Sequence, residues 1–264
     1  MIMPAPLSND RNVLIRDLRG RIERLEGAGG APGLDPAAAR TSLGIGAIAA
    51  ARTSLGIGAI DRALGGGLRR GGLHEVIAAD ESGAAAGFCA LLLARLGEDG
   101  GALLWARQGA GLYGPGLAAL GLDPARLIVV RPARDGDVLW VLEEGLRSKA
   151  PAAVLGETAS GGPIALRRLQ LAAETSGVAA LLLRPFAAKT APGPVLSRWR
   201  IESAGGGDRL SLCWRVELQR CRGGTPGTWL VEWCDETGGF AVAPELRHRP
   251  ARPAAQAVAL SASL

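Results

Sequence analysis

Hydrophobic residues recur along the chain with two different periods, and each period predicts one kind of element. Between residues 10 and 26 the apolar positions follow three- and four-residue steps, which predicts an amphipathic helix that ends at Gly27. From about Leu55 to Phe186, short apolar runs typical of buried parallel strands alternate with longer, helix-like segments. This alternation predicts an α/β fold with a mostly parallel sheet flanked by helices.

The alternating segment gives definite bounds for its elements. We expect strands at 74–78, 102–106, 127–131, 152–155 and 178–183, and helices at 84–96, 114–120, 135–148 and 163–176. Because the crossovers make the sheet parallel, the loops that follow the strands gather at one edge, where α/β proteins bind ligands.

After Pro185 the pattern changes to extended segments separated by glycine turns, at 195–202, 210–220, 228–234 and 240–242. They predict an antiparallel β extension of the sheet on its C-terminal side, or a small β subdomain. The predicted organisation is an N-terminal helix (1–27), a flexible linker (28–54), the α/β core (55–186), a β-rich extension (187–245) and a disordered tail (246–264).

A ten-residue segment occurs twice without change, at Ala39–Ile48 and at Ala51–Ile60. Only the second copy runs on into the helix start at 61–64, so we expect it to occupy the structural place while the first lengthens the linker. The apolar stripe of the N-terminal helix can dock on its own chain or join a neighbouring subunit or partner in a coiled-coil-like seam. Self-association is therefore one of the expectations.

Composition narrows the class of protein only slightly. A net charge of +5 permits contact with nucleic acid or an acidic protein surface. The four cysteines have spacings that fit no zinc site, no secretory signal precedes them, and no apolar run reaches the roughly 18 residues of a membrane span. We therefore expect a cytoplasmic protein with no metal site, and with His74 as a core or edge histidine.

A glycine-rich stretch at 64–72 leads into the strand at 74–78, a loop and the helix from Ala84, which is the order of a phosphate-binding loop. The stretch resembles RecA-family proteins and implies a RecA-like core. In register with that family, Ala78 replaces the first loop glycine, Ala84 the phosphate-binding lysine and Ala85 the magnesium-binding hydroxyl, while Gly83 is retained. The resemblance thus implies a degenerate loop.

Two further positions depart from the same family pattern. Arg107 and Gln108 stand where RecA-like ATPases carry the glutamate that activates water. Gly156 stands where the Walker B aspartate is expected, with Glu157 one residue later. Because phosphoryl transfer depends on these charges and on the magnesium they hold, we expect no ATPase activity, no catalytic residue and no cofactor.

An ordered set of motifs in the C-terminal half resembles the ImuA family. The set is Ser197–Ile201, Cys213–Leu218, Arg220–Gly227 and Trp229–Trp233, and the resemblance covers roughly residues 40–245. It implies an SOS-induced partner of ImuB and of an error-prone DnaE-type polymerase in translesion mutagenesis, with RecA as a further partner. DNA contact, if direct, is expected to be weak.

Tryptophan and arginine side chains are the candidate contacts with a partner or DNA. They are Trp199, Trp214, Trp229, Trp233, Arg198, Arg200, Arg220 and Arg222. The tryptophans either pack between sheet and helices or form a platform for a partner or stacked bases. The arginines at 220 and 222 are either a solvated hairpin tip or a contact for phosphate or acidic groups. The segment 184–207, which also holds Lys189, corresponds to a mobile DNA-binding loop in RecA proteins.

Three functions compete at this stage. The first is a non-catalytic scaffold that links ImuB and the polymerase to damaged DNA. The second is an ATP-dependent RecA-like DNA-binding ATPase in which Arg69, Arg70 or Arg107 replaces the lysine electrostatically. The third is a SulA-like inhibitor of cell division, a label that some relatives carry.

Overall fold

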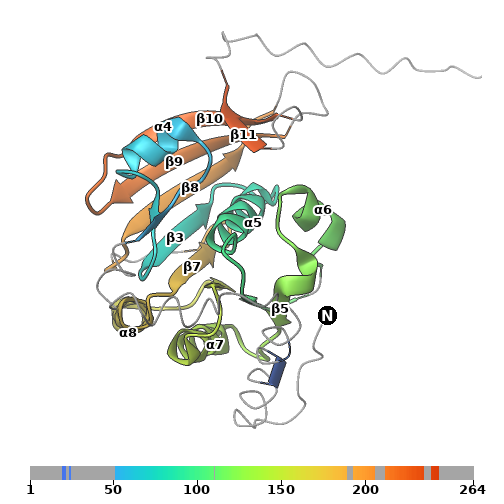
Figure 1. Cartoon of the computed structure of the whole chain (residues 1–264), viewed down its shortest axis with the longest axis vertical. Helices are drawn as coiled ribbons and strands as arrows, with labels where there is room; N and C mark the ends of the chain where they lie inside the picture. The colour runs from blue at the N-terminus through green and yellow to red at the C-terminus, as the bar shows by residue number, and fades with distance from the viewer. Residues whose placement is uncertain are drawn as a thin grey trace, which may run out of the picture.

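One large sheet forms the frame of the molecule (Figure 1). The computed structural model describes residues 20, 21, 24, 51–109, 111–188, 193–205, 212–234 and 239–243. Within these residues, nine strands follow the order β11-β10-β9-β8-β3-β7-β6-β4-β5. Their bounds are β3 (Leu73–Ala78), β4 (Leu103–Arg107), β5 (Leu127–Val130), β6 (Ala153–Glu157), β7 (Ala179–Arg184), β8 (Ser197–Ser203), β9 (Cys213–Cys221), β10 (Gly227–Cys234) and β11 (Gly239–Val242).

The strands from β5 to β8 run parallel to one another, as the crossover pattern predicted. The C-terminal strands β9, β10 and β11 add antiparallel ladders on the β8 side. The fold is therefore an α/β fold with a mostly parallel sheet, consistent with a RecA-like core. The extended segments extend this sheet and form no separate β subdomain, and the first of them, β8, pairs in parallel with β3.

Helices cover both faces of the sheet. They are α5 (Ala84–Leu96), α6 (Gly114–Ala119), α7 (Asp135–Ser148) and α8 (Pro163–Ser176), with a short 3-10 turn at Pro124–Arg126. One buried cluster lies under α5 and includes Phe88, Trp105 and Trp199. A second lies under α7 and α8 and includes Leu142 and Leu166. Both faces of the parallel strands are thus buried, which explains why their sequences are continuously apolar.

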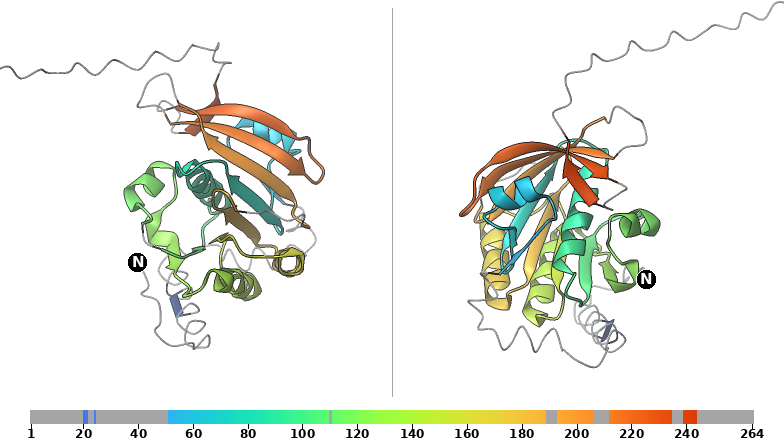
Figure 2. Two further views of the ribbon diagram at one scale, coloured as in Figure 1. Left: turned by 180° about the vertical axis from the view of Figure 1, so that it is seen from behind. Right: turned by 45° about the horizontal axis from the view of Figure 1, so that its top comes forward.

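The second copy of the repeated segment forms part of the fold. It supplies β1 (Arg52–Thr53), which pairs with β2 (Leu68–Arg69) in a separate two-stranded sheet, and leads into α4 (Gly58–Ala63). Figures 1 and 2 show α4 against β9 and β10, and its buried Ile60 belongs to the same cluster as α5. The sequence pattern did not predict this small sheet. In the structure, Arg52 and Thr53 form a strand at the end of the predicted linker.

Several predictions lie outside the described residues. The first copy of the repeat, Lys189 and the tail from 246 are all outside them, and of the N-terminal helix only Gly20, Arg21 and Arg24 are described, each in a helical conformation. The proposed division of the chain into domains therefore stays a prediction. Within the described part of the chain, no helix is long and apolar enough to cross a membrane.

Candidate functional site

Hydrogen bonds to one of its own side chains, that of Asp80, stabilise the loop between β3 and α5. Asp80 accepts hydrogen bonds at Oδ1 from the backbone N–H (2.9 Å) and the hydroxyl of Ser82, and at Oδ2 from the backbone N–H of Ser203 (2.7 Å). The Ser82 hydroxyl in turn accepts from the N–H of Ala84 at the start of α5 (3.2 Å). Two of the N–H groups that an anion could use at this helix end, those of Ser82 and Ala84, are thus engaged by the protein itself.

Electrostatics keep Asp80 charged. The hydrogen bond from the Ser82 hydroxyl lowers the pKa of Asp80 below its usual value, and the Ser203 N–H and the nearby charge of Arg200 act in the same direction. A carboxylate therefore lies in the loop that precedes α5. An anion that approached the start of α5 would meet this like charge.

The two alanines at the start of α5 belong to the hydrophobic core. Ala84 and Ala85 are buried, in the cluster that α5 shares with the sheet. Gly83 precedes them with a φ of +84°, a conformation that side-chain-bearing residues rarely adopt. A left-handed glycine therefore precedes α5, and the two positions predicted to replace the lysine and the hydroxyl are buried in packing.

The other two positions of the expected nucleotide site form an ion pair. Arg107 at the end of β4 is the register partner of Glu157 at the end of β6, and Nε lies 3.1 Å from Oε2. Burial raises the pKa of Glu157, and the charge of Arg107 opposes this rise. The two charges face each other, although Arg107 Nε donates to the carbonyl of Gln108 (3.3 Å) and Glu157 Oε2 is buried without a hydrogen-bond partner among the described residues.

Gly156 cannot carry a larger side chain unless the side chains of Leu142 and Val138 on α7 move. A Cβ placed there would lie 2.6 Å from Leu142 Cδ1 and 2.8 Å from Val138 Cγ1. Helix α7 packs directly on the backbone of β6 at this point. An aspartate at the Walker B position would collide with that packing, so the glycine has a structural reason of its own.

The sequence analysis did not predict a buried charge cluster that is centred on β3. Glu75, in the middle of β3, is fully buried and pairs with Arg184 Nε at 2.9 Å and with Arg198 Nε at 2.6 Å. Arg184 is also buried, and it donates to the carbonyls of Thr158, Ser160 and Gly161 in the loop after β6. The signal available in the sequence was a glutamate inside an apolar strand.

Arg198 and Arg200 do not lie in a mobile loop. Both are on β8, and Arg198 is held by Glu75. The connection that follows β7 is therefore shorter than the segment 184–207 suggested, since β8 begins at Ser197. The extended segment predicted at 195–202 is confirmed as β8, and the overlapping interpretation of 184–207 as one loop was wrong for these residues, because they alternate buried and less buried positions as a strand does.

The four candidate tryptophans separate into two groups. Trp199 and Trp214 are buried and join Phe88 and Phe240 in an aromatic cluster, in which Trp214 stacks on Phe240 with ring centres 4.2 Å apart. This environment favours packing over a binding platform for that pair. Trp229 and Trp233 are only partly buried and lie at the margin of the same core, so they keep an accessible side.

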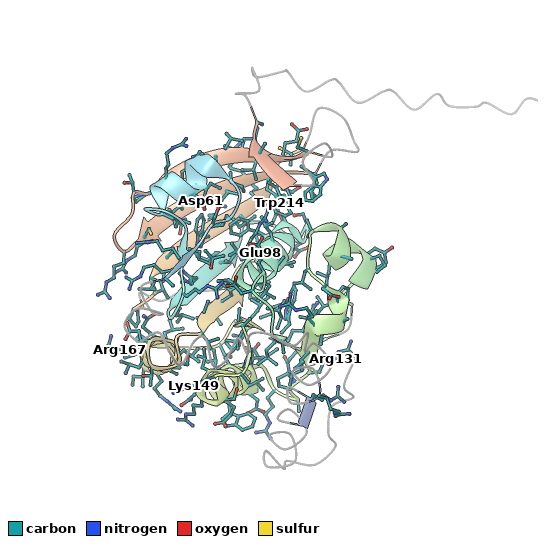
Figure 3. All side chains as sticks on the ribbon, in the orientation of Figure 1. Asp61, Glu98, Arg131, Lys149, Arg167 and Trp214 are labelled. Carbon is teal, nitrogen blue, oxygen red and sulfur yellow. The ribbon has the colours of Figure 1, made fainter. Side chains whose placement is uncertain are left out.

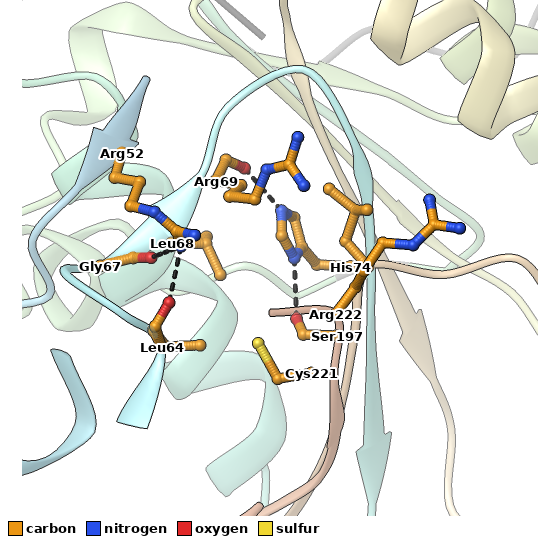
Figure 4. A pocket seen from close by; sticks show the side chains of 10 residues that line it. Arg52, Leu64, Gly67, Leu68, Arg69, His74, Ser197, Cys221 and Arg222 are labelled. Atoms are coloured by element: carbon orange, nitrogen blue, oxygen red, sulfur yellow. Dashed lines mark hydrogen bonds between the residues drawn. The ribbon is translucent and has the colours of Figure 1, made fainter. Parts of the chain in front are cut away.

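The two arginines of the β9–β10 hairpin, Arg220 and Arg222, are exposed. Arg222 lines a pocket with Arg52, Arg69 and His74 (Figure 4), but this cavity measures about 10 Å³, room for about one water molecule. Arg52 is committed there to the carbonyls of Leu64 and Gly67. The pocket is therefore too small for a nucleotide or a peptide side chain.

His74 anchors a chain of buried hydrogen bonds between β3 and β8. Its Nε2 lies 2.8 Å from the carbonyl oxygen of Arg69, which can only accept, so Nε2 carries the proton. Its Nδ1 then accepts from the Ser197 hydroxyl (2.7 Å), which itself accepts from Trp199 Nε1 (2.8 Å). The core position that the sequence suggested for this histidine is confirmed.

We expect His74 to make the stability of the protein depend on pH. Burial lowers the pKa of His74 from 6.5 to about 4, although the hydrogen bond to Arg69 raises it. Between these values the unfolded chain binds the proton and the folded chain does not. Stability is therefore complete above pH 6.5 and falls as pH falls toward 4, by about 2 kcal/mol between pH 6.5 and 5.

Urea denaturation of the wild type and of His74→Gln over pH 5 to 7 measures this effect. The wild type should lose stability toward pH 5, while the variant, which is less stable at pH 7, should show a flatter profile. Parallel profiles would assign the pH dependence to other groups.

The arginines that could replace a phosphate-binding lysine are not placed to do so. Arg69 and Arg70 precede β3 and thus lie at the opposite end of that strand from the loop at 79–83. Arg70 donates to Thr53 and Asp99, and Arg107 pairs with Glu157. Among the described residues, no group of three or more histidine, cysteine or acidic side chains is arranged to hold a metal ion.

Comparison with known proteins gives one clear relationship. No protein-family model matches the chain. The chain is similar to Protein ImuA from Caulobacter vibrioides, in each of two strains, with 42% identity over 188 residues. The aligned part covers 64% of this chain and 77% of each relative.

Proposed function

The chain belongs to the ImuA family, and from this premise we propose that it is a non-catalytic accessory protein of SOS-induced, error-prone translesion DNA synthesis. In this role it links ImuB and a DnaE-type polymerase to damaged DNA through its surfaces. The name ImuA supports the mutagenesis context, and the resemblance of the C-terminal motifs to that family supports the two partners.

One observation carries the non-catalytic part of the proposal. The charged groups near the expected nucleotide site already have neighbours within the chain: Asp80 accepts hydrogen bonds from Ser82 and Ser203, and Arg107 lies 3.1 Å from Glu157. A RecA-like ATPase needs a cation for the β- and γ-phosphates and a free carboxylate for water and magnesium. This arrangement offers neither, which argues against the ATPase alternative.

The first experiment is a titration of the purified full chain with ATP and magnesium, beside an ATPase assay with and without single-stranded DNA. We expect no saturable binding and no turnover. Binding in the micromolar range together with turnover would instead support the RecA-like ATPase.

A second experiment addresses the partners. Purified ImuB and DnaE-type polymerase are each titrated onto the immobilised full chain, and a cell-division protein of the SulA-target class serves as the comparison. We expect binding to ImuB or to the polymerase. Binding to the division protein alone would favour the SulA-like alternative.

We further expect that restoring the two missing side chains does not restore nucleotide binding. In Ala84→Lys/Ala85→Thr the lysine and hydroxyl return, but the Asp80 carboxylate and the Arg107–Glu157 pair remain. ATP binding should stay weaker than about 1 mM, measured by calorimetry. The matched control is the triple variant that carries Asp80→Ala in addition to these two substitutions. Micromolar binding by the double variant, which keeps Asp80, would show that Asp80 does not obstruct the loop.

A further inference from the structure

Helix α8 carries large aliphatic side chains on its solvent face. Ile164 is 81% exposed and Leu171 is 44% exposed. They are seven residues apart and therefore lie on one face, about 10 Å from each other along the axis. The opposite face of α8 buries Leu166, Leu169 and Ala173 against the sheet, so the exposed pair is not needed for the core.

An aromatic side chain is exposed in the turn after β7, the strand that follows α8 in the chain. Phe186 is 50% exposed and occupies a turn closed by the hydrogen bond from Ala188 N–H to the Pro185 carbonyl (3.1 Å). The next residue, Ala187, has a φ of +61°, which costs backbone strain in a residue other than glycine. Phe186 thus lies in a tight turn with half of its surface exposed.

One buried side chain, that of Arg184, links the segment before Phe186 to the loop before α8. Arg184, two residues before Phe186, donates to the carbonyls of Ser160 and Gly161, just ahead of α8. The same guanidinium is anchored on buried Glu75. The segment that leads to Phe186 and the residues just ahead of α8 are therefore linked through one guanidinium. We call Ile164, Arg167 and Leu171 the α8 patch.

The charges around the patch are mostly arginines, and the acidic residue of α8 itself, Glu174, accepts a hydrogen bond from Gln170 (2.7 Å). Arg167 projects from the outer side of α8 (Figure 3), and within the described residues it has no hydrogen-bond or ion-pair partner. On the adjoining surface the side chains of Arg147 and Arg168 are 60% and 61% exposed, whereas those of their acidic partners Glu143 and Glu144 are 10% and 15% exposed. The guanidinium groups of these ion pairs are thus more exposed than the carboxylates of Glu143 and Glu144.

We propose that the α8 patch docks an acidic amphipathic helix of a partner protein. The inference rests on the proposed function, which supplies ImuB and the polymerase as the candidate carriers of that helix. Aliphatic residues seven positions apart match the apolar stripe of an incoming helix, and the surrounding arginines match acidic residues beside that stripe. Exposed aliphatic side chains favour protein over nucleic acid, which interacts with cations and flat aromatic groups.

Ile164→Asp in the full chain tests the patch. Aspartate in the first turn of α8 is favourable to the helix, so the fold should persist, and circular dichroism verifies it. The affinity for the partner that the wild type binds, ImuB or the polymerase, should fall at least tenfold. Arg167→Glu should weaken the same complex and reduce its dependence on salt. Leu212→Asp, at a residue that is 42% exposed just before β9, is the matched control and should bind as the wild type does.

Each outcome separates the patch from the proposed function. If the wild type binds neither protein, the proposed function fails. If it binds and both α8 variants bind equally well, the α8 patch is not the docking site, while the proposed function stands. If the variants change only self-association, measured by light scattering, or only binding of single-stranded DNA, measured by fluorescence anisotropy, the assigned occupant is wrong.

Discussion

Trp214→Ala is expected to lower the free energy of unfolding by about 3–5 kcal/mol, the range for truncation of a large buried aromatic side chain. Trp214 is 2% exposed, stacks on Phe240 and meets Phe88 edge-on. Its ring approaches α5 so closely that a Cβ on Gly87 would lie 2.8 Å from it. Because a helix backbone and two aromatic rings surround the site, it cannot collapse to fill the cavity.

Urea denaturation of the full chain, followed by circular dichroism, measures the loss. The thermal midpoint should fall by at least about 6 °C, since 1 kcal/mol corresponds to about 2–4 °C in a domain of this size. Trp229→Ala is the matched control, because that ring is only partly buried, and its loss should be clearly smaller. Equal losses would mean that Trp214 has no special place in the core.

The second large effect is expected at the buried charge cluster. Glu75→Gln removes the carboxylate that compensates Arg184 and Arg198, and breaking a buried pair from one side costs about 3–5 kcal/mol. Arg184 is 1% exposed, so water cannot take over the lost partner. The three loop carbonyls that Arg184 also contacts would retain part of the arrangement, and this sets the loss toward the lower end.

Glu202→Gln provides the comparison for Glu75→Gln. Glu202 pairs with Arg215 at 3.5 Å, both side chains are well exposed, and its removal should cost less than about 1 kcal/mol. A double variant, Glu75→Leu/Arg184→Met, should regain part of the stability, because it removes two opposed buried charges together. If Glu75→Gln is as stable as the wild type, the buried charge cluster of Glu75, Arg184 and Arg198 does not stabilise the fold.

The elements of the core could be predicted from sequence because local signals agreed there. Helices α5, α7 and α8 have the predicted bounds, since each runs from a turn that follows a strand to a loop that breaks the apolar period. Strand β3 begins one residue earlier than expected, at Leu73. The β1–β2 pair was missed because two-residue strands carry no periodic signal.

The candidate site was predictable in its order and not in its contacts. The strand, loop and helix around Gly83 follow from the local sequence, as does the absence of a lysine at position 84. The hydrogen bonds of Asp80 in this loop do not follow from the local sequence, because Asp80 is held by Ser203, which lies 123 residues further along the chain. Glu75 finds Arg184 across a similarly long separation. Such pairings depend on the order of strands in the sheet, which one sequence does not specify.

The hydrophobic cluster under α5 runs from Leu103 and Trp105 on β4 to Phe240 on β11. Because the C-terminal extension and the parallel strands share this interior, they should open together as one cooperative unit. A protein that binds only at the hairpin of β9 and β10 would then slow amide exchange in β4 and β6 as well, by mass action on the folded state. A partner bound at one end of the sheet would in this way raise the stability of the other end, without any change in the structure between them.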